Sequence, residues 1–125
     1  MEFDPLSRHV LGCAIEVHKH LGPGLLESAY QACLAYELAQ LGIPFHKEED
    51  LRIIYKDEVH IDCGYRMDFV VDGKLVVELK SVDKFAPIHE AQILTYMKLS
   101  GMPIGLLLNF NVLRLKDGGI KRFVL

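Results

Sequence analysis

The sequence lacks a long hydrophobic run, a surplus of basic residues and the cysteine spacing of a metal site. No apolar run approaches the roughly 20 residues that a membrane span needs. Residues 1–6 hold two acidic side chains and no basic one, unlike the start of a signal peptide. The three cysteines, Cys13, Cys33 and Cys63, are an odd number without C-x-x-C spacing, which excludes a zinc knuckle and indicates a reducing compartment. We therefore expect a soluble cytoplasmic protein that does not enter a membrane.

The balance of charge excludes a protein that coats nucleic acid through bulk electrostatics. The formal net charge is −3, whereas such proteins are usually basic because phosphate contacts dominate their affinity. An enzyme that gathers carboxylates around a cation is compatible with this balance. The 125 residues are 50% hydrophobic and contain no repeat, linker or charge block, so we expect a single domain over residues 1–125 with its own core.

Hydrophobic periodicity predicts a series of helices and strands. Helical spacing predicts helices over residues 7–21, 25–41 and 87–100, and Gly42 is placed to end the second helix. Strands are predicted over residues 43–47, 51–55, 59–63, 65–71, 74–82, 102–110 and 121–124. We expect the first two strands to pair, and the third helix to make a right-handed parallel crossover between the fifth and sixth strands. This order predicts an α/β fold with helices around a mixed sheet.

Three charged residues stand inside apolar strands, where unpaired charge is costly. Asp68 precedes the Asp72-Gly73 turn, and Glu78 and Lys80 follow it. A two-residue turn would place Asp68 and Glu78 on opposite faces of the hairpin. A three-residue loop with a bulge would place Asp68 opposite Val76, so that Asp68, Glu78 and Lys80 share one face. The sequence permits both turns.

On a shared face, the carboxylates of Asp68 and Glu78 would repel each other unless a cation lies between them. Oxygen ligands suit a hard ion such as Mg²⁺, and Lys80 could orient a water molecule or stabilise developing negative charge. The alternative is a local ion pair in which Lys80 neutralises one of the two carboxylates.

Two helical pairs could face the same hairpin. Glu27 and Tyr30 share one side of the second helix, and Gln92 and Tyr96 lie four residues apart in the third. The helix dipole alone would also explain Glu27, and a solvated face would explain Gln92.

These motifs together resemble the GxxExxY family, a branch of the PD-(D/E)XK nuclease superfamily. The motif Gly24-x-x-Glu27-x-x-Tyr30 gives the branch its name, and residues 15–24 resemble its N-terminal segment. Residues 64–68 and 77–80 are similar to the metal-binding hairpin of the superfamily, and Gln92-x-x-x-Tyr96 to a motif of its RecB-like members. Residues 104–110 and 116–118 resemble the closing strand and turn. Met67 stands where many members have proline.

The resemblance, over about residues 11–122, implies a restriction-endonuclease-like core of order α-β-β-β-α-β. It implies that Mg²⁺, for which Mn²⁺ may substitute, is held by Asp68, Glu78, Glu27 and the backbone carbonyl of Leu79. Lys80 would then position the attacking water. The auxiliary or substrate-binding residues would be Gln92, Tyr96, Tyr30 and Arg66.

The implied activity is Mg²⁺-dependent hydrolysis of phosphodiester bonds in nucleic acid. The alternative is a non-catalytic nucleic-acid-binding or assembly module with a nuclease-like fold, and a homodimer is compatible with either function. Residues that could contact nucleic acid are Arg66, Lys84, Lys98, Lys121 and Arg122. We expect His18 to be a hydrogen-bonded, partly buried histidine, because it lies on the apolar side of its helix.

Overall fold

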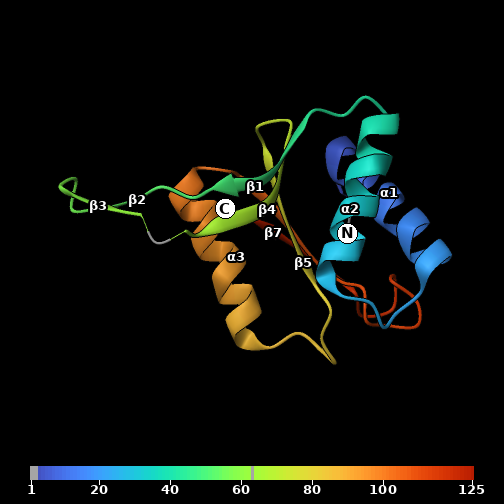
Figure 1. The fold of residues 1–125 in the computed structure, drawn as a ribbon. Helices are drawn as coiled ribbons and strands as arrows, with labels where there is room; N and C mark the ends of the chain where they lie inside the picture. Colours follow the sequence, from blue (N-terminus) through green and yellow to red (C-terminus); the bar gives the residue numbers. More distant parts are fainter. Residues whose placement is uncertain (1–2, 63) are drawn as a thin grey trace.

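The computed structural model describes residues 3–62 and 64–125, which form a five-stranded sheet between two layers of helices (Figure 1). The helices are α1 (Pro5–Leu21), α2 (Glu27–Gln40) and α3 (Pro87–Ser100). The sheet has the order β1 (Phe45–Asp50), β4 (Arg66–Val71), β5 (Leu75–Lys80), β6 (Ile104–Asn109) and β7 (Ile120–Val124). A separate hairpin contains β2 (Ile53–Tyr55) and β3 (Val59–Ile61). The predicted α/β fold class with a mixed sheet is confirmed.

The first helix begins and ends at residues that satisfy its free backbone groups. The side chain of Asp4 accepts a hydrogen bond from the N–H of Ser7 at 3.0 Å, and Pro5 occupies the first turn. At the other end, the N–H of Gly22 donates to the carbonyl of His18 at 2.8 Å, and Gly22 has a φ of 66°. The polypeptide therefore turns sharply after α1 and leads into α2.

Strand β5 is buried on both faces, which fixes the two layers. Leu75, Val77 and Leu79 pack into the cluster under α1 and α2, while Val76 packs into the cluster under α3. The parallel pairing of β5 with β6 through α3 confirms the predicted crossover.

Helix α3 lies close against β6 because Gly105 has no side chain. A Cβ atom at Gly105 would lie 2.5 Å from Sδ of Met97 and 3.1 Å from Cδ1 of Ile93. The glycine thus sets the height of α3 above the sheet, and with it the position of every side chain that α3 directs toward β5.

The predicted pairing of residues 43–47 with residues 51–55 is wrong. Strand β1 pairs with β4, from Phe45 opposite Val71 to Asp50 opposite Arg66. Strand β2 pairs with β3, and their hairpin projects away from the rest of the molecule (Figure 1). The reason is the tight turn at residues 56–57, where both φ angles are positive, because it returns the strand onto its immediate neighbour. The predicted strand over 59–63 is β3 as far as Ile61, and Cys63 lies outside the described residues.

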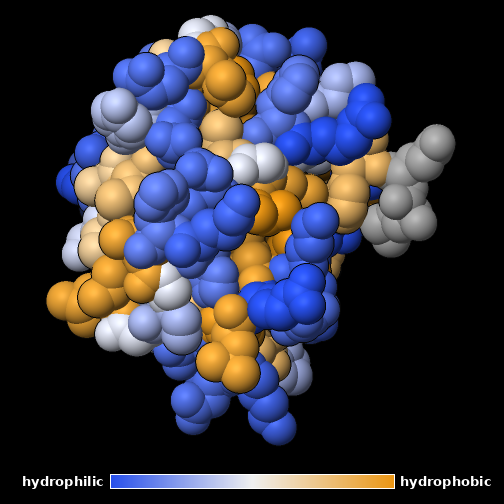
Figure 2. All heavy atoms as spheres, turned by 90° about the vertical axis from the view of Figure 1, so that its right-hand side faces the viewer, coloured by the Kyte–Doolittle hydropathy of each residue, from blue (hydrophilic) through white to orange (hydrophobic). Residues whose placement is uncertain are grey.

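Hydrophilic side chains cover much of the α1–α2 side, and apolar surface shows between them (Figure 2). None of the helices within the described residues combines the length and the hydropathy that crossing a membrane requires.

Candidate active site

The hairpin of β4 and β5 brings Asp68 and Glu78 directly across from each other. The last ladder pair is Phe69 with Val77, and the same register continues to Asp68 and Glu78. Neither register expected from the turn is therefore correct, since Asp68 faces Glu78 instead of Val76. The shared face, one of the two arrangements that the sequence permits, is the one observed, because a three-residue connection, 72–74, joins Val71 to its partner Leu75.

Side chains replace the β-ladder at the point where β4 and β5 part. The N–H of Asp68 donates to Oε2 of Glu78 at 2.7 Å, and the N–H of Leu79 donates to Oδ2 of Asp68 at 2.8 Å. Each carboxylate thus uses one oxygen to hold the opposite strand. The second oxygen of each carboxylate, Oδ1 of Asp68 and Oε1 of Glu78, forms no hydrogen bond within the described residues.

The two carboxylates lie in a region that disfavours negative charge. Glu78 is only 3% exposed, and burial, followed by repulsion from Asp68, raises the pKa of Glu78 to about 8. Burial also raises the pKa of Asp68, although the hydrogen bond from Leu79 and the charge of Lys80 act in the opposite direction. A cation between the two groups would remove this repulsion.

Lys80 belongs to a chain of hydrogen bonds that leads into α3. Its Nζ donates to Oε1 of Gln92 at 3.0 Å, and Nε2 of Gln92 donates to the hydroxyl of Tyr96 at 3.2 Å. Burial and then the charge of Glu78 raise the pKa of Tyr96. Within the described residues Lys80 forms no ion pair with Asp68 or Glu78, although its charge lowers the pKa of both. The amine is therefore near the carboxylates and held by an uncharged partner.

Glu27 lies near the hairpin without joining its hydrogen bonds. It is the first residue of α2 and exposed, and its charge raises the pKa of both Asp68 and Glu78. Gln31, one turn later, donates from Nε2 to the carbonyl of Asp68 at 3.3 Å. The start of α2 is thus attached to β4 beside the two carboxylates.

Tyr30 is fully buried and holds the loop that leads to Glu27. Its hydroxyl donates to the carbonyl of Gly22 at 2.6 Å and accepts from the N–H of Leu25 at 3.1 Å. Its ring stacks on Phe110 with 4.5 Å between centroids. The buried hydroxyl therefore holds the loop between α1 and α2, and the side chain has no exposed surface for contact with a substrate.

The donor set fits a hard divalent cation in part. Asp68 and Glu78 offer two carboxylate oxygens, and Mg²⁺ is commonly held by one or two carboxylates together with water. Within residues 3–62 and 64–125, no three His, Cys, Asp or Glu side chains are gathered closely enough to hold a metal ion by themselves. Glu27 therefore does not complete a three-carboxylate cluster in this arrangement.

Two neighbours of the site were absent from the sequence prediction. Glu48, whose charge raises the pKa of Asp68, belongs to β1, and the incorrect pairing of that strand concealed it. Asn109 is 1% exposed and bonds both backbone groups of Val82, with Oδ1 accepting at 3.1 Å and Nδ2 donating at 2.8 Å. It fixes the chain just beyond Lys80. An asparagine at the end of a fully apolar strand was the available signal.

Three of the expected contacts for nucleic acid are paired with carboxylates. Arg66 lies 3.4 Å from Asp50, Lys121 lies 2.8 Å from Glu90, and Arg122 lies 2.9 Å from Asp4. Their charges are therefore partly neutralised within the protein.

Comparison with known proteins gives one result. Neither the curated proteins nor the solved structures contain a match to the chain. The family model for the PD-(D/E)XK nuclease superfamily matches residues 4–123, which include the whole sheet except the last residue of β7 and both carboxylates of the hairpin. The chain belongs to the PD-(D/E)XK nuclease superfamily.

Proposed function

We propose that this protein is a Mg²⁺-dependent nuclease of the GxxExxY branch that hydrolyses phosphodiester bonds in nucleic acid. The observation that carries the proposal is the exchange of hydrogen bonds between Asp68 and Glu78 where the strands part. Each carboxylate is oriented by backbone of the opposite strand, and each keeps a second oxygen for a cation. A buried pair of like charges is costly for a protein to keep without such a use.

Some residues of the site would bind the ion, and Lys80 would act on the water or the phosphate. Asp68 and Glu78 would hold the ion together with the carbonyl of Leu79, and Glu27 would reach it through one of the water molecules that complete its coordination. A divalent ion, when bound, offsets negative charge on the scissile phosphate. Lys80, held by Gln92 at 3.0 Å, would orient the attacking water or stabilise charge that develops on the phosphate.

The experiment that tests the proposal measures metal binding and cleavage separately. Mn²⁺ is titrated calorimetrically, into the millimolar range, into the wild type, Glu78→Gln and the control Glu58→Gln, which changes an exposed residue in the turn of the projecting hairpin. We expect binding in the wild type and the control, and none in Glu78→Gln. Labelled DNA and RNA are then tested for Mg²⁺-dependent products. Identical titrations, or products that persist in Glu78→Gln, would reject the assignment.

An assembly module is the second candidate, and the projecting hairpin favours it. Ile54, Tyr55 and Val59 of this hairpin are 47%, 56% and 52% exposed, so it presents apolar surface away from the sheet. Light scattering of the wild type and of Tyr55→Ser would reveal a homodimer that depends on this surface. A folded, monomeric protein with metal-dependent cleavage would reject the second candidate.

A further inference from the structure

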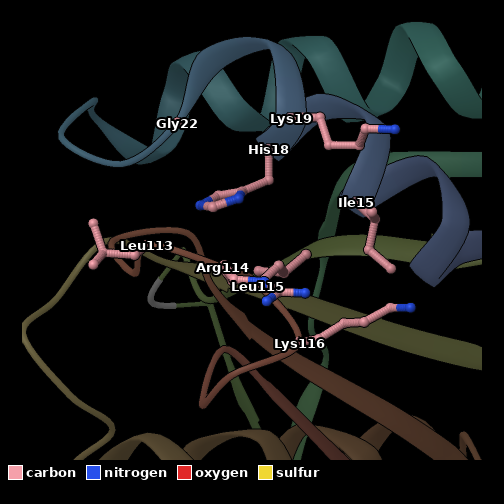
Figure 3. A pocket seen from close by; sticks show the side chains of 8 residues that line it. All are labelled: Ile15, His18, Lys19, Gly22, Leu113, Arg114, Leu115 and Lys116. Carbon is pink, nitrogen blue, oxygen red and sulfur yellow. The ribbon is translucent and has the colours of Figure 1, made fainter.

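A pocket of about 470 Å³ lies between the last turn of α1 and the loop that joins β6 to β7 (Figure 3). Its lining includes the basic residues Lys19, Arg114 and Lys116 and no acidic residue. In Figure 3, Lys19 comes from the helix, Lys116 comes from the loop opposite, and both side chains extend toward the same side of the view. A protein of net charge −3 thus has a hollow whose charged side chains are all positive.

Four backbone carbonyl groups around this pocket already accept hydrogen bonds. The carbonyl of His18 accepts from Gly22 at 2.8 Å, and that of Gly22 accepts from Tyr30 at 2.6 Å. The carbonyls of Arg114 and Leu115 accept from residues 117 and 119 at 2.9 and 3.0 Å. The charged groups of the lining are all cationic side chains.

The ordinary explanations cover only part of this cluster. A basic residue in the last turn of a helix stabilises the helix dipole, which accounts for Lys19. Arg114 and Lys116 belong to a different segment, so the dipole does not account for them. Arg114 lies 3.6 Å from Asp117, but both side chains are largely exposed and such pairs are weak. Within the described residues, neither Lys19 nor Lys116 forms an ion pair.

The pocket is preformed and joined to the candidate active site by a fixed loop. Buried His18 donates from Nε2 to the carbonyl of Val112 at 2.8 Å, which confirms its predicted role and holds the β6–β7 loop against α1. On the other side, the hydroxyl of Tyr30 holds residues 22 and 25. The carbonyl of Leu25 accepts from the hydroxyl of Ser81 at 2.7 Å, next to Lys80. One short segment therefore separates the pocket from the end of β5.

We propose that this pocket binds a phosphate group of the nucleic-acid strand, away from the bond that is cut. The proposal rests on the proposed function for the nature of the substrate. It explains how an acidic protein could hold a polyanion, because the phosphate contacts are concentrated in one basic pocket. The volume lies within the range of small-ligand sites, so it accommodates a phosphate with part of its nucleotide.

The test compares two variants that remove the same charge from different places. The pocket variant is Lys19→Gln/Arg114→Gln/Lys116→Gln, and the control is Arg8→Gln/Arg52→Gln/Lys56→Gln, three exposed residues outside the pocket. Binding of a short fluorescent oligonucleotide is measured between about 50 and 200 mM salt, where each lost phosphate contact lowers the slope of log K against log salt by about 0.7 to 0.9. We expect the pocket variant to lose about 10-fold or more in affinity at the lower salt, with a smaller slope, and the control to keep the wild-type slope.

The outcomes separate this inference from the proposed function. Equal slopes for the two variants, or no binding by the wild type, would overturn the pocket. If the pocket variant has the expected smaller slope but the wild type cleaves neither DNA nor RNA, the nuclease is rejected and the pocket stands. Oligonucleotides with a 5′ phosphate and with a 5′ hydroxyl are compared, because a loss confined to the former identifies a terminal phosphate, and an equal loss identifies an internal one.

Discussion

The carboxylate of Glu78 takes the place of a β-strand partner for Asp68. Its Oε2 accepts the N–H of Asp68 at 2.7 Å, and the carboxylate of Asp68 accepts the N–H of the residue after Glu78 at 2.8 Å. The same two side chains that end the pairing of β4 with β5 also create the acidic site. Their burial therefore affects the stability of the fold as well as its chemistry.

Replacing Glu78 should remove a pH-dependent loss of stability. The pKa of Glu78 is raised from 4.5 to about 8 in the folded protein, so the folded state keeps a proton that the unfolded chain releases between these values. The free energy of unfolding of the wild type should fall as pH rises from about 4.5 to about 8, by an amount of the order of a few kcal/mol without divalent cations. In Glu78→Gln most of this fall should be absent, and the part that remains comes from Asp68, whose pKa burial also raises. Urea denaturation across that pH range in EDTA measures it.

The control for this prediction is Glu58→Gln, at an exposed position. It should retain the pH dependence of the wild type. Addition of Mn²⁺ at pH 8 should stabilise the wild type and this control but not Glu78→Gln, because a ligand that binds only the folded state stabilises it. Parallel curves for the wild type and Glu78→Gln would contradict the prediction.

Loss of the Lys80 amine should abolish cleavage without unfolding the protein. Lys80→Met keeps the aliphatic part of the side chain, and we expect the rate to fall by about 100-fold or more. Gln92→Ala, which removes the partner of the amine, should lower the rate less, because Gln92 acts by positioning Lys80. The double variant should be no slower than Lys80→Met alone. Single-turnover rates of all three would reveal this, and a further additive loss would show that Gln92 acts independently.

Removal of the Tyr30 hydroxyl should destabilise the protein while the ring stays in place. Tyr30→Phe keeps the stack on Phe110 but leaves the carbonyl of Gly22 and the N–H of Leu25 without their partner. We expect a loss of about 1 to 3 kcal/mol in the free energy of unfolding. Tyr36→Phe, on the same helix but 62% exposed, should change it by less than about 0.5 kcal/mol. Equal effects in the two variants would contradict the role of the Tyr30 hydroxyl in holding the loop between α1 and α2.

A methyl group at Gly105 should push α3 away from the sheet. Gly105→Ala would place a Cβ atom 2.5 Å from Sδ of Met97, and such overpacking costs about 1 to 3 kcal/mol. Gly12→Ala in α1, where no atom lies within 4 Å of the added Cβ, should stabilise the protein by up to about 1 kcal/mol. Thermal unfolding distinguishes the two. Because Met97 is fully buried, Met97→Ala is destabilising by itself, but the double variant should lose less than the sum of the two single variants. Additive losses would place the strain elsewhere.

Local patterns were sufficient to predict the helices and the charged hairpin. The predicted third helix has the observed bounds, Pro87–Ser100, because Pro87 and Gly101 mark its two ends. Asp68 and Glu78 stood out because carboxylates interrupt apolar strands, and this signal needs no knowledge of the distant chain.

What the sequence concealed depends on backbone conformation and on long-range pairing. Glu48, Lys56, Asp57 and Asp72 all have positive φ angles between 50° and 58°, a conformation that is normally inferred from glycine or asparagine. Lys56 and Asp57 lie in the β2–β3 turn, Asp72 lies in the β4–β5 turn, and Glu48 lies within β1. The pairing of residues 51–55 and the register of the β4–β5 hairpin were therefore predicted incorrectly. The pairing of β1 with β4 joins distant segments, which hydrophobic periodicity alone does not specify.

The projecting hairpin leaves and rejoins the sheet at one place. Asp50 and Arg66 are partners in the ladder of β1 and β4, and the N–H of Leu51 donates to the carbonyl of Tyr65 at 2.9 Å. The segment between these residues is thus an insertion whose two ends are already hydrogen-bonded to each other. Replacing this inserted segment by one of different length or composition would leave β1 paired with β4, and Asp68 and Glu78 in register. The fold can therefore present a different surface to other molecules at this position while the arrangement of the candidate active site stays the same.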